Sequence, residues 1–361
     1  MSCRIVVGMS GGVDSSVAAA LLVEQGYEVI GVTLRVWPWR EREDPRERFG
    51  SCCSPEAVDD ARQVARRLGI PYYLLNHERE FDRAVITDFA SEYVAGRTPS
   101  PCVVCNRDVK FGTLLRRAWA WEAEAVATGH YARIARDPTG GRFLVRRGRD
   151  ARKDQSYFLW PLTQAQLAAA RFPVGDLTKE EVRAKARTLG LVTADKPESQ
   201  EICFIPEGDY RSFLRRRIPE AFRPGPIVDR RGHVLGTHEG IASYTVGQRR
   251  GLGISADRPF YVLEVDPERN AVVVGEGSEL ETDQLIAIQV NFIPFDRLDG
   301  ARRVSAKIRR SHAPAAATLY PAGSDRVRVE FDVPQRAVTP GQSVVFYDGD
   351  LVVGGGIISR A

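Results

Sequence analysis

The sequence lacks any apolar stretch long enough to cross a membrane. Its apolar runs, such as the one from Val17 to Val23, are far shorter than the roughly 20 residues that a membrane-spanning helix needs. The N-terminal segment contains a short apolar run but no small-residue cleavage site of the kind that ends a signal peptide. We therefore expect a cytoplasmic protein with no membrane partner.

Cysteine is also scarce. Six cysteines in 361 residues are too few for a disulfide scaffold, and in a reducing compartment thiols more often serve metal binding or catalysis. Cys3 precedes an apolar segment and is expected to be a packing residue. Cys52 and Cys53 stand just before a helix signal at Ser54, and we expect them to pack in a loop.

Lysine is nearly absent. The 51 basic residues comprise 6 Lys and therefore 45 Arg (51 − 6), against 47 acidic residues and a formal net charge of +4. Guanidinium groups are planar and always charged, so they suit phosphate contacts and stacking on bases. A genome rich in G and C produces the same bias, so composition alone does not establish a nucleic-acid partner.

The first 200 or so residues alternate short apolar runs with helical patterns. Regular alternation of strand and helix predicts an α/β domain with a parallel sheet covered on both faces. The predicted strands are 4–9, 27–37, 71–75 and 125–131, and the predicted helices are 15–26, 54–68, 80–95 and 108–121.

The rest of the chain is rich in sequence patterns typical of β-strands. Short alternating segments separated by Gly-containing turns predict a small central β domain at 207–277, after a first domain at 1–206. Residues 278–361 contain successive strand patterns without helices. They predict a closed six-stranded β-barrel of the type common in RNA-binding appendages.

A glycine-rich segment, GMSGGVDSS, follows the first predicted strand at residues 8–16. Glycine amides and a helix N-terminus at the carboxyl edge of a parallel sheet together form an anion site. The Gly-Lys-Ser/Thr ending of the Walker loop and the third glycine of the dinucleotide fingerprint are both missing. A tight turn capped by Asp14 or Ser15 is the structural alternative.

The same segment resembles the signature of ATP pyrophosphatases, which cleave ATP between the α and β phosphates. The resemblance implies that Ser10, Gly11, Gly12 and Ser15 hold pyrophosphate and that Asp14 positions it through Mg²⁺. The ATP contacts implied by the whole loop are Gly8, Met9, Ser10, Gly11, Gly12, Val13, Asp14 and Ser15.

Five further stretches carry a more specific resemblance. AGRTPSPCVVCNRDVKFG, ATGHYAR, KDQSYFL, ESQEICFIP and YTVGQRRGLG, which begin at residues 95, 127, 153, 198 and 244, are similar in order and spacing to the tRNA-specific 2-thiouridylases. The resemblance spans essentially the whole chain. It implies a PP-loop domain of the adenine nucleotide alpha hydrolase type, a central β domain and a C-terminal barrel.

The family resemblance implies a reaction in two steps. Oxygen 2 of the wobble uridine attacks the α phosphate of ATP, and sulfur then displaces AMP from carbon 2. Cys203 would carry a persulfide from a donor or relay protein fed by a cysteine desulfurase, and Cys105 would release the sulfur by closing a Cys105–Cys203 disulfide. Cys105 is expected just ahead of a helix and near Arg107 and Lys110, which favour the thiolate. Without the resemblance, Cys203 would be a small buried hydrophobe.

The resemblance also assigns contacts with ATP and tRNA. Leu34 and Gly129 would lie beside the adenine and ribose, although a core leucine and a turn glycine are the structural alternatives. His130 would more often be a structural histidine than a ligand. The implied tRNA contacts are Ser100, Pro101, Cys102, His130, Lys153, Asp154, Gln155, Arg309, Arg310 and Gln342.

Cys102 leaves a second mechanism open. Many family members have Asp at this position, and a third thiol beside Cys105 and Cys203 would suit a [4Fe–4S] cluster with one open iron. We favour the persulfide route and keep the cluster as the alternative, while zinc lacks a fourth ligand. A pyrophosphatase ligase acting on a small metabolite and a non-catalytic RNA-binding protein are the competing functions. Neither explains the glycine loop, the paired thiols and the barrel together.

Overall fold

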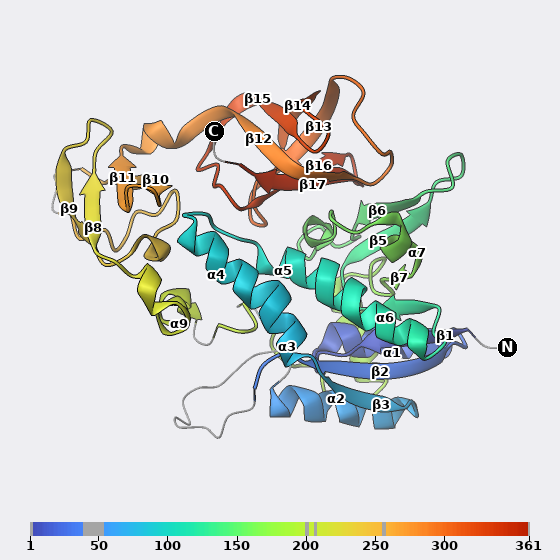
Figure 1. Cartoon of the computed structure of the whole chain (residues 1–361). Coiled ribbons are helices and arrows are strands. Elements are labelled where there is room, and N and C mark those ends of the chain that lie inside the picture. The colour runs from blue at the N-terminus through green and yellow to red at the C-terminus, as the bar shows by residue number, and fades with distance from the viewer. Residues whose placement is uncertain (1–2, 39–53, 199–201, 206–207, 255–257, 360–361) are drawn as a thin grey trace. The chain divides into compact units, whose positions relative to one another are not determined.

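The computed structural model describes residues 3–38, 54–198, 202–205, 208–254 and 258–359 (Figure 1). Two compact units can be distinguished. The first comprises Met1–Val85, Cys102–Gly208 and Asp350–Val352, and the second comprises Ile86–Pro101, Asp209–Gly349 and Val353–Ala361. The predicted packing of Cys52 and Cys53 lies outside the described residues.

The first unit contains a parallel sheet, as predicted, with the four predicted strands and a fifth, β7, that was not predicted. Its strand order is β3-β2-β1-β4-β7, which places the first strand of the chain at the centre. Strand β1 is buried on both faces because its residues are β-branched and apolar. The strands are β1 (Arg4–Gly8), β2 (Glu28–Arg35), β3 (Tyr72–Asn76), β4 (Ala125–Ala127) and β7 (Ala170–Arg171).

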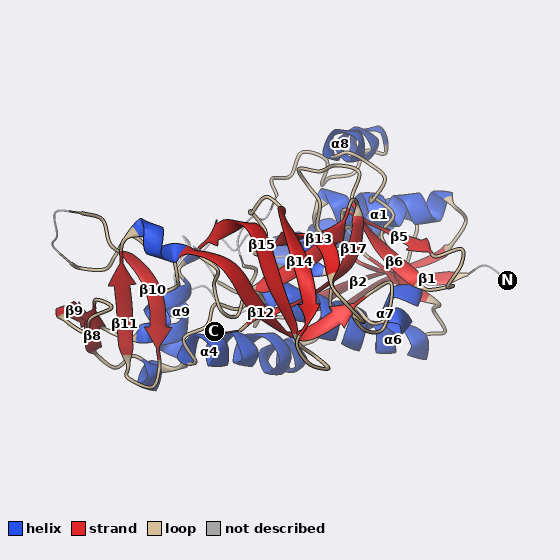
Figure 2. Ribbon diagram, turned by 90° about the horizontal axis from the view of Figure 1, so that it is seen from above, coloured by secondary structure: helices blue, strands red, loops and turns tan. Residues whose placement is uncertain are grey.

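Helices cover both faces of this sheet. Figure 2 shows α1 (Val13–Glu24) and α8 (Lys179–Thr188) on one side of the strands and α6 (Leu114–Ala120) on the other. Helix α2 (Pro55–Leu68) has the predicted bounds, because the Ser54 side chain caps its N-terminus and Gly69 ends it in the left-handed conformation. The sheet therefore has the layered α/β architecture that the alternating pattern indicates.

Three predicted helices differ in their bounds: α1 begins and ends two residues earlier than the predicted 15–26, and the other two differ more. The segment expected at 80–95 consists of α3 (Glu78–Phe81), a π-helical segment (Asp82–Ile86) and α4 (Thr87–Val94). The helix expected at 108–121 begins earlier, with α5 (Pro101–Val104) and a π-helical segment (Cys105–Thr113) before α6. Pro101 suits a helix start because its missing N–H would have no helical partner there. The expectation that Cys105 precedes the helix is therefore wrong.

Sequence patterns did not predict the remaining small elements of the first unit. A hairpin of β5 (Ala132–Arg136) and β6 (Phe143–Arg147) follows β4, and Arg146 pairs with Leu351. The other elements are a 3-10 turn at Ser156–Phe158 and α7 (Gln164–Ala168).

The second unit contains a small sheet and a barrel. The sheet has the order β10-β11-β8-β9 and agrees with the predicted central β domain. Its strands are β8 (Gly225–Val228), β9 (Val234–His238), β10 (Tyr261–Asp266) and β11 (Ala271–Gly275). The helical elements beside them are α9 (Tyr210–Arg217) and three 3-10 turns (Pro219–Ala221, Ile241–Ser243 and Gly277–Leu280).

The barrel is closed and six-stranded, as predicted. Its strand order is β12-β15-β14-β13-β16-β17, and pairing between β12 and β17 closes it. Alternate residues such as Leu319, Val329 and Phe346 fill the interior. The strands are β12 (Glu281–Phe292), β13 (Arg302–Lys307), β14 (Ala315–Pro321), β15 (Val327–Arg336), β16 (Ser343–Asp348) and β17 (Leu351–Ile358). Among the described residues, no helix has the length and apolar character needed to span a membrane.

Candidate active site

The glycine loop lies between β1 and α1 and is held from two sides. The Met9 amide donates to the Val32 carbonyl oxygen at 2.8 Å, and the Thr33 hydroxyl donates to the Met9 carbonyl oxygen at 2.6 Å. Gly11 has a φ of +67°, and a Cβ added there would lie 2.1 Å from the carbonyl oxygen of Ala57. Only glycine fits at this position, so the path of the loop is determined by its contact with α2.

The N-terminus of α1 has no side-chain cap. Its N-cap residue is Gly12, so the alternative that Asp14 or Ser15 caps the helix is wrong. The Ser15 hydroxyl instead donates to the Gly12 carbonyl oxygen at 3.2 Å and accepts from the Ser10 amide at 3.1 Å. Uncapped N–H groups at a helix N-terminus, preceded by a rigid glycine turn, are suited to bind an anion.

A cavity of about 230 Å³ opens beside this loop. Val32, Val36 and Phe81 make part of its wall apolar, and Lys110 adds a cationic group. The loop residues Gly11, Gly12 and Val13 do not line it. The predicted site residues that do line it are Gly8, Met9, Ser10, Asp14, Ser15, Leu34, Cys105, Gly129, His130, Gln155 and Cys203.

Gly129 is packed directly against the start of α1. A Cβ added to Gly129 would lie 2.6 Å from the Ser15 nitrogen and 2.6 Å from the carbonyl carbon of Asp14. The close approach of the two backbones explains why glycine is needed after β4. It also brings the end of β4 into the wall of the cavity beside the loop.

The structure brings Cys105 and Cys203 to the same cavity, although 98 positions (203 − 105) separate them in the chain. Cys105 begins the π-helical segment, and Cys203 lies in a turn. Phe204, which is 1% exposed, anchors this turn by packing edge-on against Phe81 at 5.6 Å. Arg107, which was expected to favour the Cys105 thiolate, is paired with Asp108 at 2.8 Å.

Cys102 has different surroundings from Cys105 and Cys203. Its side chain is exposed, and it does not line the cavity that holds Cys105 and Cys203. Within the ranges that the structure describes, no three His, Cys, Asp or Glu side chains lie close enough together to hold a metal ion. The three cysteines therefore do not fit an iron–sulfur cluster in this arrangement.

A cluster of charges behind the loop was not predicted. The Lys179 ammonium lies 2.7 Å from Asp14 Oδ1, 2.9 Å from Asp14 Oδ2 and 2.9 Å from Glu198 Oε1. The Lys153 ammonium lies 2.7 Å from Glu198 Oε2. Burial raises the pKa of Glu198, but the hydrogen bonds and charges of the two lysines outweigh it and hold the pKa at about 2. The sequence feature that could have indicated this cluster is a lysine at the first position of a helix, where acidic residues are favoured.

Tyr131 completes this cluster. Its hydroxyl donates to Asp14 Oδ1 at 2.7 Å, and burial followed by the charge of Asp14 raises the pKa of the phenol. Both oxygens of Asp14 are therefore engaged by protein groups. The role of Asp14 in positioning pyrophosphate through Mg²⁺ stays a prediction.

His130 is a neutral wall residue in this structure. Burial, followed by the charge of Lys110, lowers the pKa of His130 well below its ordinary value. Its Nδ1 is hydrogen-bonded to the Thr128 hydroxyl at 2.6 Å, and its ring packs against Phe172 at 5.7 Å. The side chain therefore offers a neutral imidazole to the cavity rather than a cation.

The predicted tRNA residues 153–155 form a loop with intrachain contacts. Asp154 accepts hydrogen bonds from the Gly148 and Ser156 amides, each at 3.1 Å. Gln155 accepts one from the Tyr131 amide at 3.0 Å. These bonds position the loop at the edge of the cavity.

The remaining predicted tRNA residues, apart from Cys102, belong to the second unit. The Gln342 amide nitrogen donates to the Thr98 carbonyl oxygen at 2.8 Å and to the Pro99 carbonyl oxygen at 3.2 Å, so it supports the segment that leads to Ser100 and Pro101. One Arg309 guanidinium nitrogen donates to the Arg336 carbonyl oxygen at 3.4 Å. Arg310 is exposed.

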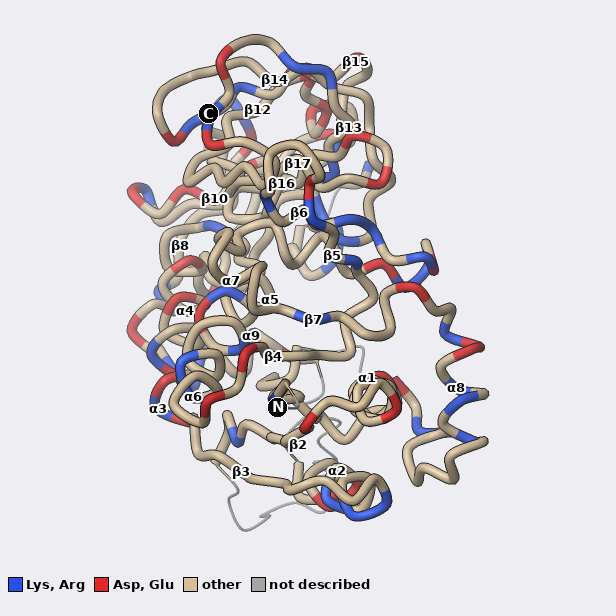
Figure 3. Tube along the Cα trace, turned by 90° about the vertical axis from the view of Figure 1, so that its right-hand side faces the viewer, with Lys and Arg blue, Asp and Glu red and all other residues tan. Residues whose placement is uncertain are grey.

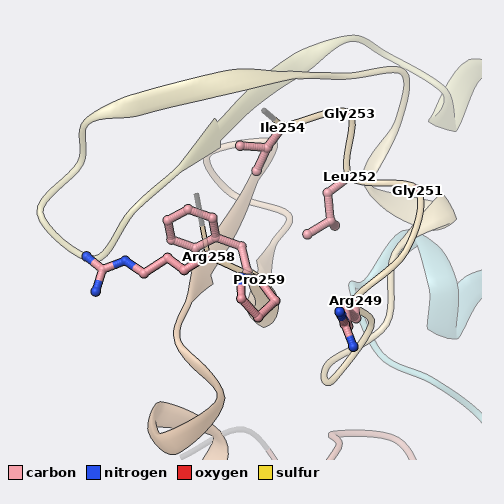
Figure 4. A pocket seen from close by; sticks show the side chains of 8 residues that line it. Arg249, Gly251, Leu252, Gly253, Ile254, Arg258 and Pro259 are labelled. Carbon is pink, nitrogen blue, oxygen red and sulfur yellow. The ribbon is translucent and has the colours of Figure 1, made fainter. Parts of the chain in front are cut away.

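A second cavity, of about 380 Å³, lies in the second unit (Figure 4). Leu252, Ile254 and Phe260 give it apolar walls, and the guanidinium groups of Arg249 and Arg258 point away from Leu252 and Ile254. Among the described residues that line it, none is a thiol, an imidazole or a carboxylate. The loop-side cavity, whose described lining includes two thiols and an imidazole, is therefore the candidate active site.

Comparisons with known proteins agree along the whole chain. Three family models match successive parts: the tRNA methyl transferase HUP domain at residues 3–207, the tRNA methyl transferase PRC-barrel domain at 211–276, and the aminomethyltransferase beta-barrel domain at 282–358.

Several curated relatives are similar over nearly their full length. The tRNA-specific 2-thiouridylase MnmA of Symbiobacterium thermophilum is 56% identical over 99% of this chain and 92% of its own. The protein of that name from Moorella thermoacetica is 55% identical over 98% of both chains. That from Acetivibrio thermocellus is 53% identical over 98% of this chain and 99% of its own.

Proposed function

We propose that this chain, which belongs to the family of tRNA-specific 2-thiouridylases, uses ATP to replace oxygen 2 of the wobble uridine of tRNA with sulfur. The enzyme is a tRNA uridine 2-sulfurtransferase. The observation that carries the proposal is one cavity lined by both the anion-binding loop and two cysteines. Activation of a carbonyl oxygen by ATP and delivery of sulfur require these two features side by side.

ATP is the substrate of the first step. Ser10, Gly11, Gly12 and Ser15 hold the pyrophosphate portion at the uncapped N-terminus of α1, with Gly8, Met9, Val13 and Asp14 completing the loop. Leu34 and Gly129 lie against the adenine and ribose, which their places in the cavity wall support. Mg²⁺ enters with ATP as part of the substrate. Attack of uridine oxygen 2 on the α phosphate leaves an adenylated base and pyrophosphate.

Sulfur transfer follows at the two thiols. Cys203 carries a persulfide, whose outer sulfur comes from a donor or relay protein fed by a cysteine desulfurase. That sulfur bonds to carbon 2 of the adenylated base and AMP leaves, while Cys105 attacks the inner sulfur of Cys203. The products are 2-thiouridine, AMP and a Cys105–Cys203 disulfide, which a cellular thiol reductant reopens. The shared cavity supports this pairing, and the exposed position of Cys102 disfavours the cluster mechanism.

The tRNA contacts form three groups. Ser100, Pro101 and Cys102 lie next to the target base, and the barrel residues Arg309, Arg310 and Gln342 contact the tRNA elsewhere. The contacts expected near the anticodon are His130, Lys153, Asp154 and Gln155. We further propose that the chain works in the cytoplasm as three domains, 1–206, 207–277 and 278–361.

The test is formation of 2-thiouridine. The protein is incubated with ATP, a persulfide donor and unmodified tRNA, and the nucleosides are analysed by mass. We expect 2-thiouridine only when all three are present, and Cys203→Ser should abolish it while ATP binding persists. If no 2-thiouridine forms under donor conditions that support an established thiouridylase, the proposal is rejected.

A further inference from the structure

Lys179 is a buried lysine in an unusual place. It is 6% exposed and is the first residue of α8, where the helix dipole presents its positive end. Lysine is almost never this buried unless its charge is paired. Helix α8 (Figure 3) has acidic residues in its first turn and basic residues in its last turn, and the other α8 lysine, Lys185, pairs with Glu24 at 2.7 Å.

The backbone of Lys179 is held independently of its side chain. Thr178 and Glu181 form a capping box at the start of α8, and the Lys179 amide donates to Asp150 Oδ2 at 3.1 Å. Helix α8 packs along α1, the helix that begins at the nucleotide loop. The start of α8 therefore fixes the position of the Lys179 ammonium next to the loop.

The ammonium joins two acidic residues from different parts of the site. Asp14, which is engaged through both oxygens, lies in the first turn of α1, and Glu198 stands five positions before Cys203 (203 − 198). The same nitrogen lies 5.7 Å from the ring centre of Tyr131. Asp14 of the nucleotide loop and Glu198 are thus connected through the Lys179 side chain.

An acidic residue in an anion-binding loop needs a neutralising cation. A bare Asp14 carboxylate would repel the triphosphate that the loop is suited to bind. Buried ion pairs contribute little net stability, because the cost of removing both charges from water offsets their attraction. Here Lys179 is buried and Asp14 is partly exposed, with 30% of its side chain accessible, so the pair points to a role in positioning the loop rather than in stability.

We propose that Lys179 is a positioning residue for the nucleotide loop, whose ammonium neutralises and orients Asp14 and holds it beside Glu198. Lys179 thus takes the place at Asp14 that the sequence resemblance assigns to Mg²⁺. This inference rests on the proposed function, because it supposes that the loop binds ATP.

A double-mutant cycle on ATP binding tests the inference. Calorimetry measures ATP affinity for the wild-type chain, Lys179→Met, Asp14→Asn and the double variant. We expect Lys179→Met to weaken ATP binding at least about tenfold, because Asp14 is then unneutralised. In the Asp14→Asn background, Lys179→Met should weaken ATP binding less than about threefold, because no charge at position 14 remains to be neutralised. The matched control is Lys185→Met, which removes a paired lysine from the same helix and should leave ATP affinity unchanged.

Further readouts separate positioning from folding. Lys179→Arg should restore ATP binding to within about threefold of wild type, since a guanidinium can pair with both carboxylates. If Lys179→Met does not fold, as judged by circular dichroism, Lys179→Arg and the double variant still report the coupling.

Three results would overturn the inference: unchanged affinity in Lys179→Met, an equal loss in both backgrounds, or loss of ATP binding in Asp14→Asn alone. The last would make Asp14 itself a nucleotide or metal ligand. Failure of the wild-type chain to bind ATP would instead reject the proposed function.

Discussion

At the scale of single residues, Gly11 and Gly26 share a positive φ but differ in their surroundings. A Cβ added to Gly11 would overlap the Ala57 carbonyl oxygen, whereas one added to Gly26 would meet no atom within 4 Å. We expect Gly26→Ala to lower the free energy of unfolding by about 1 kcal/mol through backbone strain alone. Gly11→Ala should cost about 3 kcal/mol, because the loop must also move. Urea unfolding measures both, and equal losses would contradict the packing described for the loop.

Glu198 makes the stability of the charge cluster depend on pH. Its carboxyl pKa is lowered from 4.5 to about 2 in the folded protein, so its contribution is present above about pH 4.5 and is lost as the pH falls toward 2. We expect Glu198→Gln to be less stable than wild type at pH 7. The difference in unfolding free energy should shrink as the pH is lowered from 5 to 3. A difference that stays constant over this range would show that Glu198 is not held as a carboxylate by the two lysines.

At the scale of elements, sequence patterns predicted most of the architecture. The buried parallel strands, the Ser54-capped helix and the barrel strands follow from β-branched runs, a cap signal and alternation. The helix start at Pro101 was not predicted, because proline is typical of turns as well as of helix starts. The β5–β6 hairpin was missed as well, since its two strands are only five residues long and each contains two arginines.

The π-helical segment that begins at Cys105 is supported from outside. The Gln166 amide nitrogen donates to the carbonyl oxygens of Arg107 at 2.8 Å and Phe111 at 2.9 Å, while its oxygen accepts from the Thr163 amide. These bonds satisfy carbonyl groups within the π-helical segment that carries Cys105.

Gln166→Glu removes both donors but keeps the acceptor. We expect it to lower the free energy of unfolding by about 2 kcal/mol and to slow 2-thiouridine formation, because the segment with Cys105 loses its support. Thr163→Ala serves as the control: it removes the cap of α7, should cost about 1 kcal/mol, and should leave the rate unchanged. Equal rates for the two variants would mean that Gln166 does not position the segment.

At the scale of the whole molecule, the sequence alone predicted the site unevenly. The glycine loop, Cys105, Cys203, Leu34 and Gly129 were found from local motifs and a family resemblance, and the fold brings them to one cavity. Lys179 could not be found this way, because its role depends on the packing of α8 against α1. A lysine at a helix start is unusual, but this local feature does not identify Asp14 or Glu198 as its partners.

The charge of Arg310 gives a prediction about tRNA binding. If Arg310 contacts a tRNA phosphate, Arg310→Ala should weaken tRNA binding and reduce the slope of log affinity against log salt concentration by about one. ATP affinity should not change. Arg297→Ala is the control, since Arg297 is also exposed and is not among the predicted contacts. An unchanged salt slope would remove Arg310 from the tRNA interface.

The most direct measurement of the central claim is a single turnover of protein loaded with persulfide. Cys203 is loaded with labelled sulfur, the donor is removed, and ATP and unmodified tRNA are added. Mass analysis then follows the label in tRNA and the Cys105–Cys203 peptide pair. The account predicts up to one labelled 2-thiouridine per persulfide, formed only with ATP and accompanied by the disulfide, and none from Cys105→Ser. Labelled 2-thiouridine from Cys105→Ser at the wild-type rate, or transfer without ATP, would contradict it.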